Sequence, residues 1–93
     1  MKLVTKERAT ELVARGLRDL GYQRVSHGHG TKYYSKVGTY WKIRISNHPD
    51  LGQNHDVCHD VVLDGPTIMS DIDHRIKKAD EAFERKTRKR FGS

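Results

Sequence analysis

The stretch TKYYSKVGTYWKIRIS, residues 31–46, decides the fold. Within it, Tyr40–Ser46 alternates strictly between apolar and polar residues, which is the pattern of a strand with one buried face. The apolar face consists of Trp41, Ile43 and Ile45. Thr31–Val37 is rich in β-forming residues, and Gly38 marks a turn between the two segments. The stretch therefore predicts two adjacent strands joined by a turn.

A helix is predicted before these strands. Apolar residues recur at the i, i+3, i+4 spacing from Ala9 to Leu20, and the Thr5 side chain can cap the N-terminus. Gly21 follows the last apolar position, where a residue with positive φ ends a helix at low steric cost. Tyr22–Ser26 then predicts a short strand, which the glycine-rich turn 27–30 joins to the next one.

The second half of the chain predicts one further strand and a second helix. Residues 47–54 have the composition of a loop, and His55–Leu63 alternates imperfectly as a third main strand. Residues 64–66, Asp-Gly-Pro, interrupt it. Thr67 or Ser70 can cap a helix whose apolar residues repeat at helical spacing. These residues are Ile68, Met69, Ile72, Ile76, Ala79 and Phe83.

The predicted fold class is therefore α+β. It consists of an N-terminal helix, a three- or four-stranded antiparallel meander and a C-terminal helix (α-β-β-β-α). A chain of 93 residues buries too little surface for two cores, so residues 1–93 are predicted to form one domain. The basic residues 85–93 are expected to fray at the end of the second helix.

The charge of the chain is unevenly distributed. The net charge is +6, which favours a polyanionic partner because basic side chains release phosphate counterions on binding. All 18 basic residues lie before Ile45 or after His74, whereas the segment between these two contains six aspartates. We therefore expect a molecule with electrostatically different regions.

Several functional classes are disfavoured by composition. No apolar run exceeds three residues, so neither a membrane span nor an apolar leader is predicted. Cys58 is the only cysteine, which excludes an internal disulfide and agrees with a cytoplasmic location. No cofactor motif is present, and none is predicted. An edge strand of so small a sheet could pair across a two-fold axis, which would give a homodimer.

Basic and aromatic residues are combined on the predicted hairpin. Cations neutralise phosphates and aromatic rings stack on bases, so a strand surface that carries both is typical of nucleic-acid binding. The predicted DNA or RNA contacts on the hairpin are Lys32, Tyr34, Lys36, Tyr40, Lys42 and Arg44. Those on the second helix are Arg85, Lys86, Arg88, Lys89 and Arg90. The competing interpretation is that the tyrosines belong to the core and the charges to a solvated face.

Histidines offer two further candidate sites. Metal-ligand types occur together at His48, His55, Cys58 and His59. In a strand, however, Cys58 and His59 point to opposite faces, and no CxxC or HExxH accompanies them, which favours a polar strand face without metal. His27 and His29 have the residue type for proton transfer in a metal-free ribonuclease, with Lys32 as a cation. No catalytic partner is identifiable, which favours a mobile turn and a protein that is not an enzyme.

The order helix, three-stranded meander, helix resembles the double-stranded-RNA-binding fold, which small messenger-RNA-cleaving toxins of the HicA type share. That resemblance implies RNA as a partner and, in the toxins, a catalytic histidine in a Gly-Ser-His motif. The corresponding segment here reads Ser-His-Gly-His-Gly, residues 26–30. Tyr33-Tyr34 followed by Ile-Arg-Ile-Ser-Asn-His, residues 43–48, is also similar to small proteins of phages and mobile elements. That similarity implies an origin and no particular activity. An alternative function is that of a phage-type inhibitor or adaptor, such as an anti-defence or anti-CRISPR-like factor, because small basic domains without catalytic motifs suit binding to a nucleic-acid-handling host protein.

Overall fold

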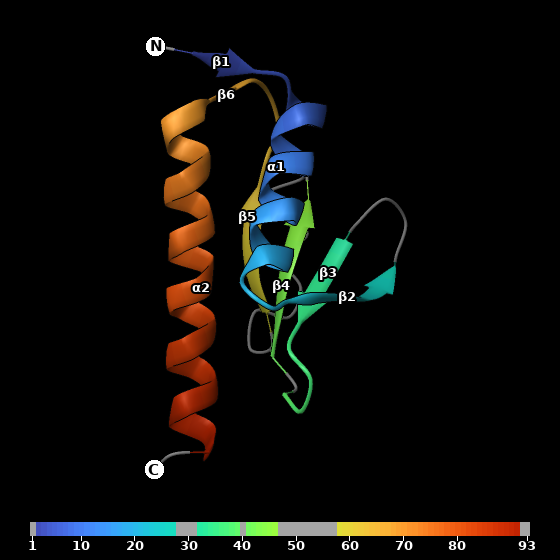
Figure 1. The fold of residues 1–93 in the computed structure, drawn as a ribbon, viewed down its shortest axis with the longest axis vertical. Coiled ribbons are helices and arrows are strands. Elements are labelled where there is room, and N and C mark those ends of the chain that lie inside the picture. The colour runs from blue at the N-terminus through green and yellow to red at the C-terminus, as the bar shows by residue number, and fades with distance from the viewer. Residues whose placement is uncertain (1, 28–31, 40, 47–57, 92–93) are drawn as a thin grey trace.

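The computed structural model describes residues 2–27, 32–39, 41–46 and 58–91. The described residues form two helices and six strands, so the predicted α+β class is confirmed (Figure 1). The elements are β1 (Leu3–Val4), α1 (Lys6–Asp19), β2 (Gln23–His27), β3 (Lys32–Ser35), β4 (Lys42–Ser46), β5 (Cys58–Val62), β6 (Thr67–Ile68) and α2 (Met69–Phe91).

The main sheet has four strands in the order β2-β3-β4-β5. Strands β2, β3 and β4 pair antiparallel, as the predicted meander requires. Strand β5 differs from the prediction, because it pairs parallel to β4, with Arg44 opposite Asp60. Parallel neighbours need a long connection, and the segment 47–57 between the two strands is long enough to provide one. The alternation within β5 is the same for either direction, so the sequence could not distinguish them.

A second, two-stranded sheet joins the N-terminal segment to the start of α2. Leu3 pairs with Ile68 and Val4 with Thr67, in antiparallel register. The backbone N–H of Met69 also donates to the carbonyl of Lys2, at 2.8 Å. Strands of two residues are too short for a period-two pattern, which is why the sequence did not predict them.

Helix α1 begins and ends where the sequence predicts. The Thr5 hydroxyl oxygen accepts a hydrogen bond of 3.1 Å from the backbone N–H of Arg8, which satisfies one of the free donors of the first turn. Gly21 follows the helix with φ of +100°, a conformation that costs glycine little. Ala9, Val13 and Leu17 are fully buried along the inner side of the helix.

Helix α2 extends to residue 91. Residues 81–91 contain no glycine or proline and are rich in good helix formers. Its apolar side packs against α1, and the contact is closest at Gly16, where an added Cβ would lie 2.5 Å from Ile76 Cδ1. No helix among the described residues is long and apolar enough to span a membrane.

One hydrophobic core lies between the two helices and one face of the main sheet (Figure 1). The predicted apolar face of β4 is confirmed, since Ile43 and Ile45 are buried there. Phe83 of α2 occupies the centre, with its ring centroid 4.9 Å from that of Tyr22 and 6.1 Å from that of Trp41. The Tyr22 hydroxyl donates to Asp80 Oδ1 at 2.7 Å, and burial together with this bond raises the pKa of Tyr22.

Candidate nucleic-acid interface

The structure does not bring the predicted hairpin contacts onto one exposed face. Tyr34 is 1% exposed and lies in the core, in register with Ile43, so its ring cannot stack on a base in this conformation. Tyr33, whose side chain points to the opposite face of β3, is half-buried. Lys36 points toward the helices, where its Nζ lies 4.8 Å from the centre of the Tyr22 ring. The Lys32 side chain and Tyr40 lie outside the described residues.

Arg44 is part of the sheet's own structure rather than an exposed cation. Its guanidinium donates to both carboxylate oxygens of Asp60, at 2.5 and 2.6 Å, across the parallel strands β4 and β5. The two side chains are only 7% and 15% exposed. Because each bond of this bidentate pair is charge-assisted, a phosphate would have to displace Asp60 to reach Arg44. Lys42 lies two residues earlier on the same strand and is half-buried.

The basic end of α2 is placed only in part. Arg85 and Lys86 are exposed on the helix, as expected for phosphate contacts. The side chains of Arg88, Lys89 and Arg90 lie outside the described set, although their backbone belongs to α2. This end of the helix extends beyond the main sheet (Figure 1).

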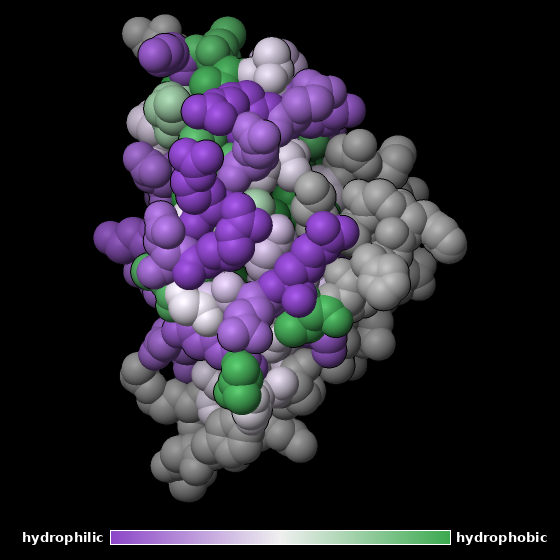
Figure 2. Space-filling view, turned by 45° about the vertical axis from the view of Figure 1, so that its right-hand side comes forward, coloured by the Kyte–Doolittle hydropathy of each residue, from purple (hydrophilic) through white to green (hydrophobic). Residues whose placement is uncertain are grey.

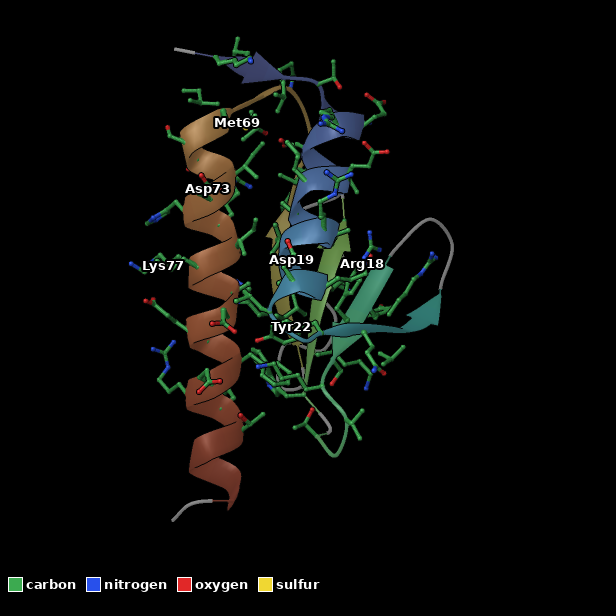
Figure 3. The ribbon with its side chains drawn as sticks, in the orientation of Figure 1. Arg18, Asp19, Tyr22, Met69, Asp73 and Lys77 are labelled. Atoms are coloured by element: carbon green, nitrogen blue, oxygen red, sulfur yellow. The ribbon has the colours of Figure 1, made fainter. Side chains whose placement is uncertain are left out.

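One side of α2 is acidic. Asp73 and Asp80 lie toward α1 and line a shallow groove of about 380 Å³ together with Asp19 of α1. Figure 3 shows Asp19 at the end of α1 and Asp73 on α2, on the two sides of this groove. Among the described residues, no three histidine, cysteine, aspartate or glutamate side chains come close enough to hold a metal ion. The groove is therefore lined by three carboxylates and by the ammonium group of Lys77.

The side of α2 that faces β5 carries three basic or imidazole side chains and one carboxylate. His74, Lys78 and Arg85 lie at i, i+4 and i+11, and because eleven residues complete just over three helical turns, they fall in one row. We call these three residues the basic row. Glu81, at i+7, is an exposed carboxylate in the same row. The row runs beside β5, and both Lys78 and Arg85 lie close enough to His59 of that strand to affect its protonation.

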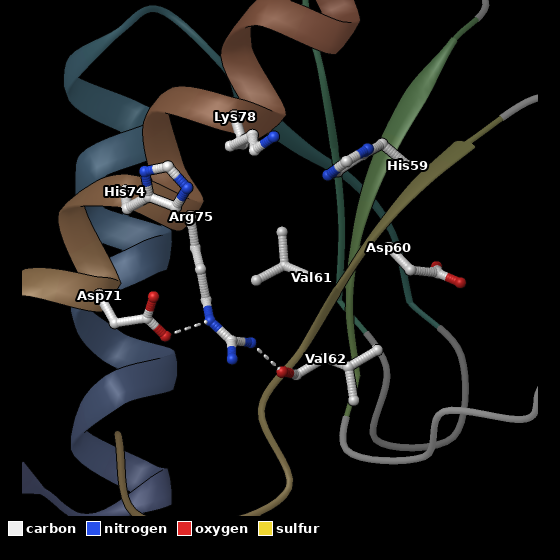
Figure 4. Close-up of a pocket in the computed structure, with 8 residues that line it drawn as sticks. All are labelled: His59, Asp60, Val61, Val62, Asp71, His74, Arg75 and Lys78. Atoms are coloured by element: carbon white, nitrogen blue, oxygen red, sulfur yellow. Dashed lines mark hydrogen bonds and ion pairs between the residues drawn. The ribbon is translucent and has the colours of Figure 1, made fainter. Parts of the chain in front are cut away.

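A pocket of about 310 Å³ lies between β5 and the basic row (Figure 4). We call it the β5–α2 pocket. Its lining is His59, Asp60, Val61, Val62, Asp71, His74, Arg75 and Lys78. Val61 gives it an apolar floor, while the imidazoles of His59 and His74, the Lys78 ammonium, the Arg75 guanidinium and the Asp71 carboxylate lie around it (Figure 4).

Arg75 fixes the distance between α2 and β5 at this pocket. Its Nε donates to Asp71 Oδ2 at 2.9 Å, one helical turn away. Its Nη1 donates to the backbone carbonyl of Val62, which ties the helix to the strand. Two hydrogen bonds hold the guanidinium plane, so Arg75 forms a preorganised wall of the pocket.

His59 faces the helices and not a set of metal ligands. Its ring lies 6.4 Å from that of Trp41, centroid to centroid, at a tilt of 42°. Burial lowers the pKa of His59; Asp60 opposes this effect, whereas the charges of Arg85 and Lys78 add to it. The imidazole is therefore neutral near pH 7 in the unbound protein. The positive charges of Lys78 and Arg85 also disfavour a metal ion at His59, which the sequence offered as a candidate metal ligand.

The remaining histidine predictions fall largely outside the described residues. This holds for His29, His48 and His55, and also for the side chains of His27 and Cys58. Sequence reasoning named Arg85 but missed His74 and Lys78 of the basic row, although their signal was available. The i, i+4, i+11 spacing of the row can be read from the sequence once α2 is known to continue through position 85.

Comparisons with protein families, with characterised proteins and with solved structures found no match to this chain. The function is therefore argued from the geometry and chemistry of the site.

Proposed function

We propose that this protein is a small nucleic-acid-binding module that holds a phosphate backbone against the basic row of α2. The observation that carries the proposal is the pair of exposed cations Lys78 and Arg85 on the side of α2 that faces β5, neither of which forms an ion pair among the described residues. A polyanion requires such cations on a single continuous surface.

The basic row has cations that are available to phosphate. Among the residues that the structure describes, neither Lys78 nor Arg85 forms an ion pair, in contrast to Arg44 and Arg75. Neutralising a phosphate with either side chain would therefore break no existing salt bridge. Release of the condensed counterions would provide the favourable free energy, and it would make binding strongly salt-dependent.

The acidic side of α2 would restrict how the nucleic acid lies. Asp73 and Asp80 repel phosphates from the groove along α1, and Asp19 adds to this negative surface. The backbone would then follow β5 and the basic row toward the C-terminal end of the helix, where Lys86 is exposed. This path replaces the hairpin face that the sequence favoured.

The surface offers less support for the protein-binding alternative. In the view of Figure 2, exposed apolar residues are separated by hydrophilic ones rather than joined in one patch. Val25 and Val37 are the most exposed apolar residues of the β2–β4 region, at 48% and 84%. Apolar residues scattered in this way are ordinary on protein surfaces. We therefore take the nucleic-acid function as the conclusion.

Two adjacent lysines provide a matched test of the interface. Lys78 belongs to the basic row, whereas Lys77 lines the acidic groove, and both are exposed on α2. We expect Lys78→Ala to weaken binding to a labelled oligonucleotide by about tenfold, as for loss of one charge-assisted contact. The slope of log affinity against log salt should fall by about 1. Lys77→Ala removes the same charge and should leave both quantities nearly unchanged.

Fluorescence anisotropy of the three proteins across a salt series gives both quantities. Equal losses in the two variants would mean that only net charge matters and that the interface lies elsewhere. Circular dichroism should show the same helix content in both variants, since the two substitutions change the same residue type in the same helix.

A further inference from the structure

We infer that the β5–α2 pocket binds one phosphoryl group of the nucleic acid. His59 takes up a proton when the nucleic acid binds, and its imidazolium then contacts that phosphoryl group. This inference rests on the proposed function and adds to it a specific subsite and a proton linkage. In this role His59 binds a phosphoryl group. The sequence offered it only as a metal ligand, and it is not one of the three residues of the basic row.

The pocket has the size and lining of a site for a small anion. A volume of about 310 Å³ is at the lower end of the range of ligand pockets, which suits a single charged group better than a large cofactor. The Arg75 guanidinium in its wall is engaged by Asp71 and by the Val62 carbonyl, so the cation of the lining that is free to meet an anion is Lys78. Lys78 lies on the same side of the pocket opening as His74, across from His59.

The charged groups around His59 come from two elements. Asp60 adjoins it on β5, but the Asp60 carboxylate is engaged by Arg44. From α2, Lys78 and Arg85 act on the imidazole, and His74, Arg75 and Asp71 line the same pocket. The ring of Trp41, just before β4, lies on the remaining side and excludes water without adding charge. Burial is the largest cause of the lowered pKa of His59, and the two cations of α2 add an electrostatic contribution that an anion would compensate.

Binding of a phosphate reverses this balance. The anion screens Lys78 and Arg85 and adds an opposite charge near the ring, and both effects favour the imidazolium form. The pKa of His59 is therefore higher in the complex than in the unbound protein. Affinity should be lowest well above the pKa of the complex, should rise as pH falls below it, and should level off below the pKa of the unbound protein. The total gain is about tenfold for each unit by which the two pKa values differ.

The linkage is measured as the affinity for one labelled single-stranded oligonucleotide at about pH 8 and about pH 5.5, on either side of the ordinary histidine range. Salt concentration is held constant. We expect the wild-type protein to bind about threefold to tenfold more tightly at the lower pH, the size that a pKa difference of about half a unit to one unit gives. His59→Gln should lose most of this gain but keep the affinity measured at the higher pH. His27→Gln is the control, because it removes an imidazole from β2, at the opposite edge of the main sheet from β5, and should keep the gain.

A second measurement does not depend on a variant that folds. The imidazole carbon-bound proton of His59 in the wild-type protein can be followed by NMR through a pH titration, with and without the oligonucleotide. Its midpoint should move to higher pH in the complex. An unchanged midpoint, or an equal pH gain in His59→Gln and wild type, would overturn the inference. Binding that persists with either of these results would leave the proposed function intact, whereas absence of binding at both pH values would remove both.

Discussion

Asp60→Ala is expected to lower the free energy of unfolding by about 3–5 kcal/mol, because it leaves the buried Arg44 guanidinium without its carboxylate. The Arg44 side chain is 7% exposed, so water cannot replace the two hydrogen bonds that Asp60 accepts. Equilibrium urea denaturation measures the loss. Asp64→Ala is the control, since this exposed aspartate four residues later should change stability by less than about 0.5 kcal/mol.

The double variant Arg44→Met with Asp60→Leu distinguishes two quantities: the net contribution of the ion pair to the free energy of unfolding, and the loss that follows when only one partner is removed. Apolar side chains of similar size remove both buried charges, so we expect most of the stability lost in Asp60→Ala to return. A loss below about 1 kcal/mol in Asp60→Ala would contradict the burial that the structure assigns to this pair. The result also concerns the site, because His59 adjoins Asp60 on β5 and depends on the position of that strand.

Phe83→Ala is expected to cost about 3–5 kcal/mol, the range for removing a large aromatic side chain from a core. Phe83 is 1% exposed, and its ring packs against both Tyr22 and Trp41. The substitution would leave a cavity where α2 meets the sheet. A single domain is stable by only about 5–15 kcal/mol in total, so the variant should melt at a much lower temperature.

Thermal unfolding followed by circular dichroism checks this expectation. Lys86→Ala, three residues later on the same helix, is the matched control and should change stability by no more than about 0.5 kcal/mol. Similar melting temperatures for the two variants would show that Phe83 is not central to the core.

The local elements of this fold could be predicted from the sequence because their signals are local. The Thr5 cap and the Gly21 stop enclose one amphipathic helix, and the alternation in Tyr40–Ser46 gives both a strand and its buried face. Strand direction was not predictable in the same way. Strands β4 and β5 pair in parallel, and no residue pattern within either strand indicates whether the pairing is parallel or antiparallel.

Which residue of the tyrosine pair is buried could also not be predicted from the sequence. Tyr33 and Tyr34 are adjacent and of the same type, so alternation alone cannot tell which one is buried. Register decides it, because Tyr34 pairs with Ile43 and must share its face. The prediction of Tyr34 as a stacking platform was therefore not supported by its position, and Tyr33 lies opposite Arg44 instead.

The candidate site escaped sequence reasoning for a related reason. Asp60 is the partner of Arg44 although sixteen residues separate them, and this contact removes a cation that composition alone offers to phosphate. His59 and Lys78 come from different elements and meet only through the packing of α2 beside β5. Basic composition indicated a polyanionic partner, while the surface that would bind it required the fold.

The measurement to make first is a titration of the wild-type protein, freed of bound nucleic acid, into labelled single-stranded and duplex DNA and RNA at two salt concentrations. We predict binding to at least one class that weakens steeply with salt, because contacts by Lys78, Arg85 and their neighbours release condensed counterions. Absence of binding to all four at low salt would contradict the proposed function, and the search for a partner would then turn to proteins.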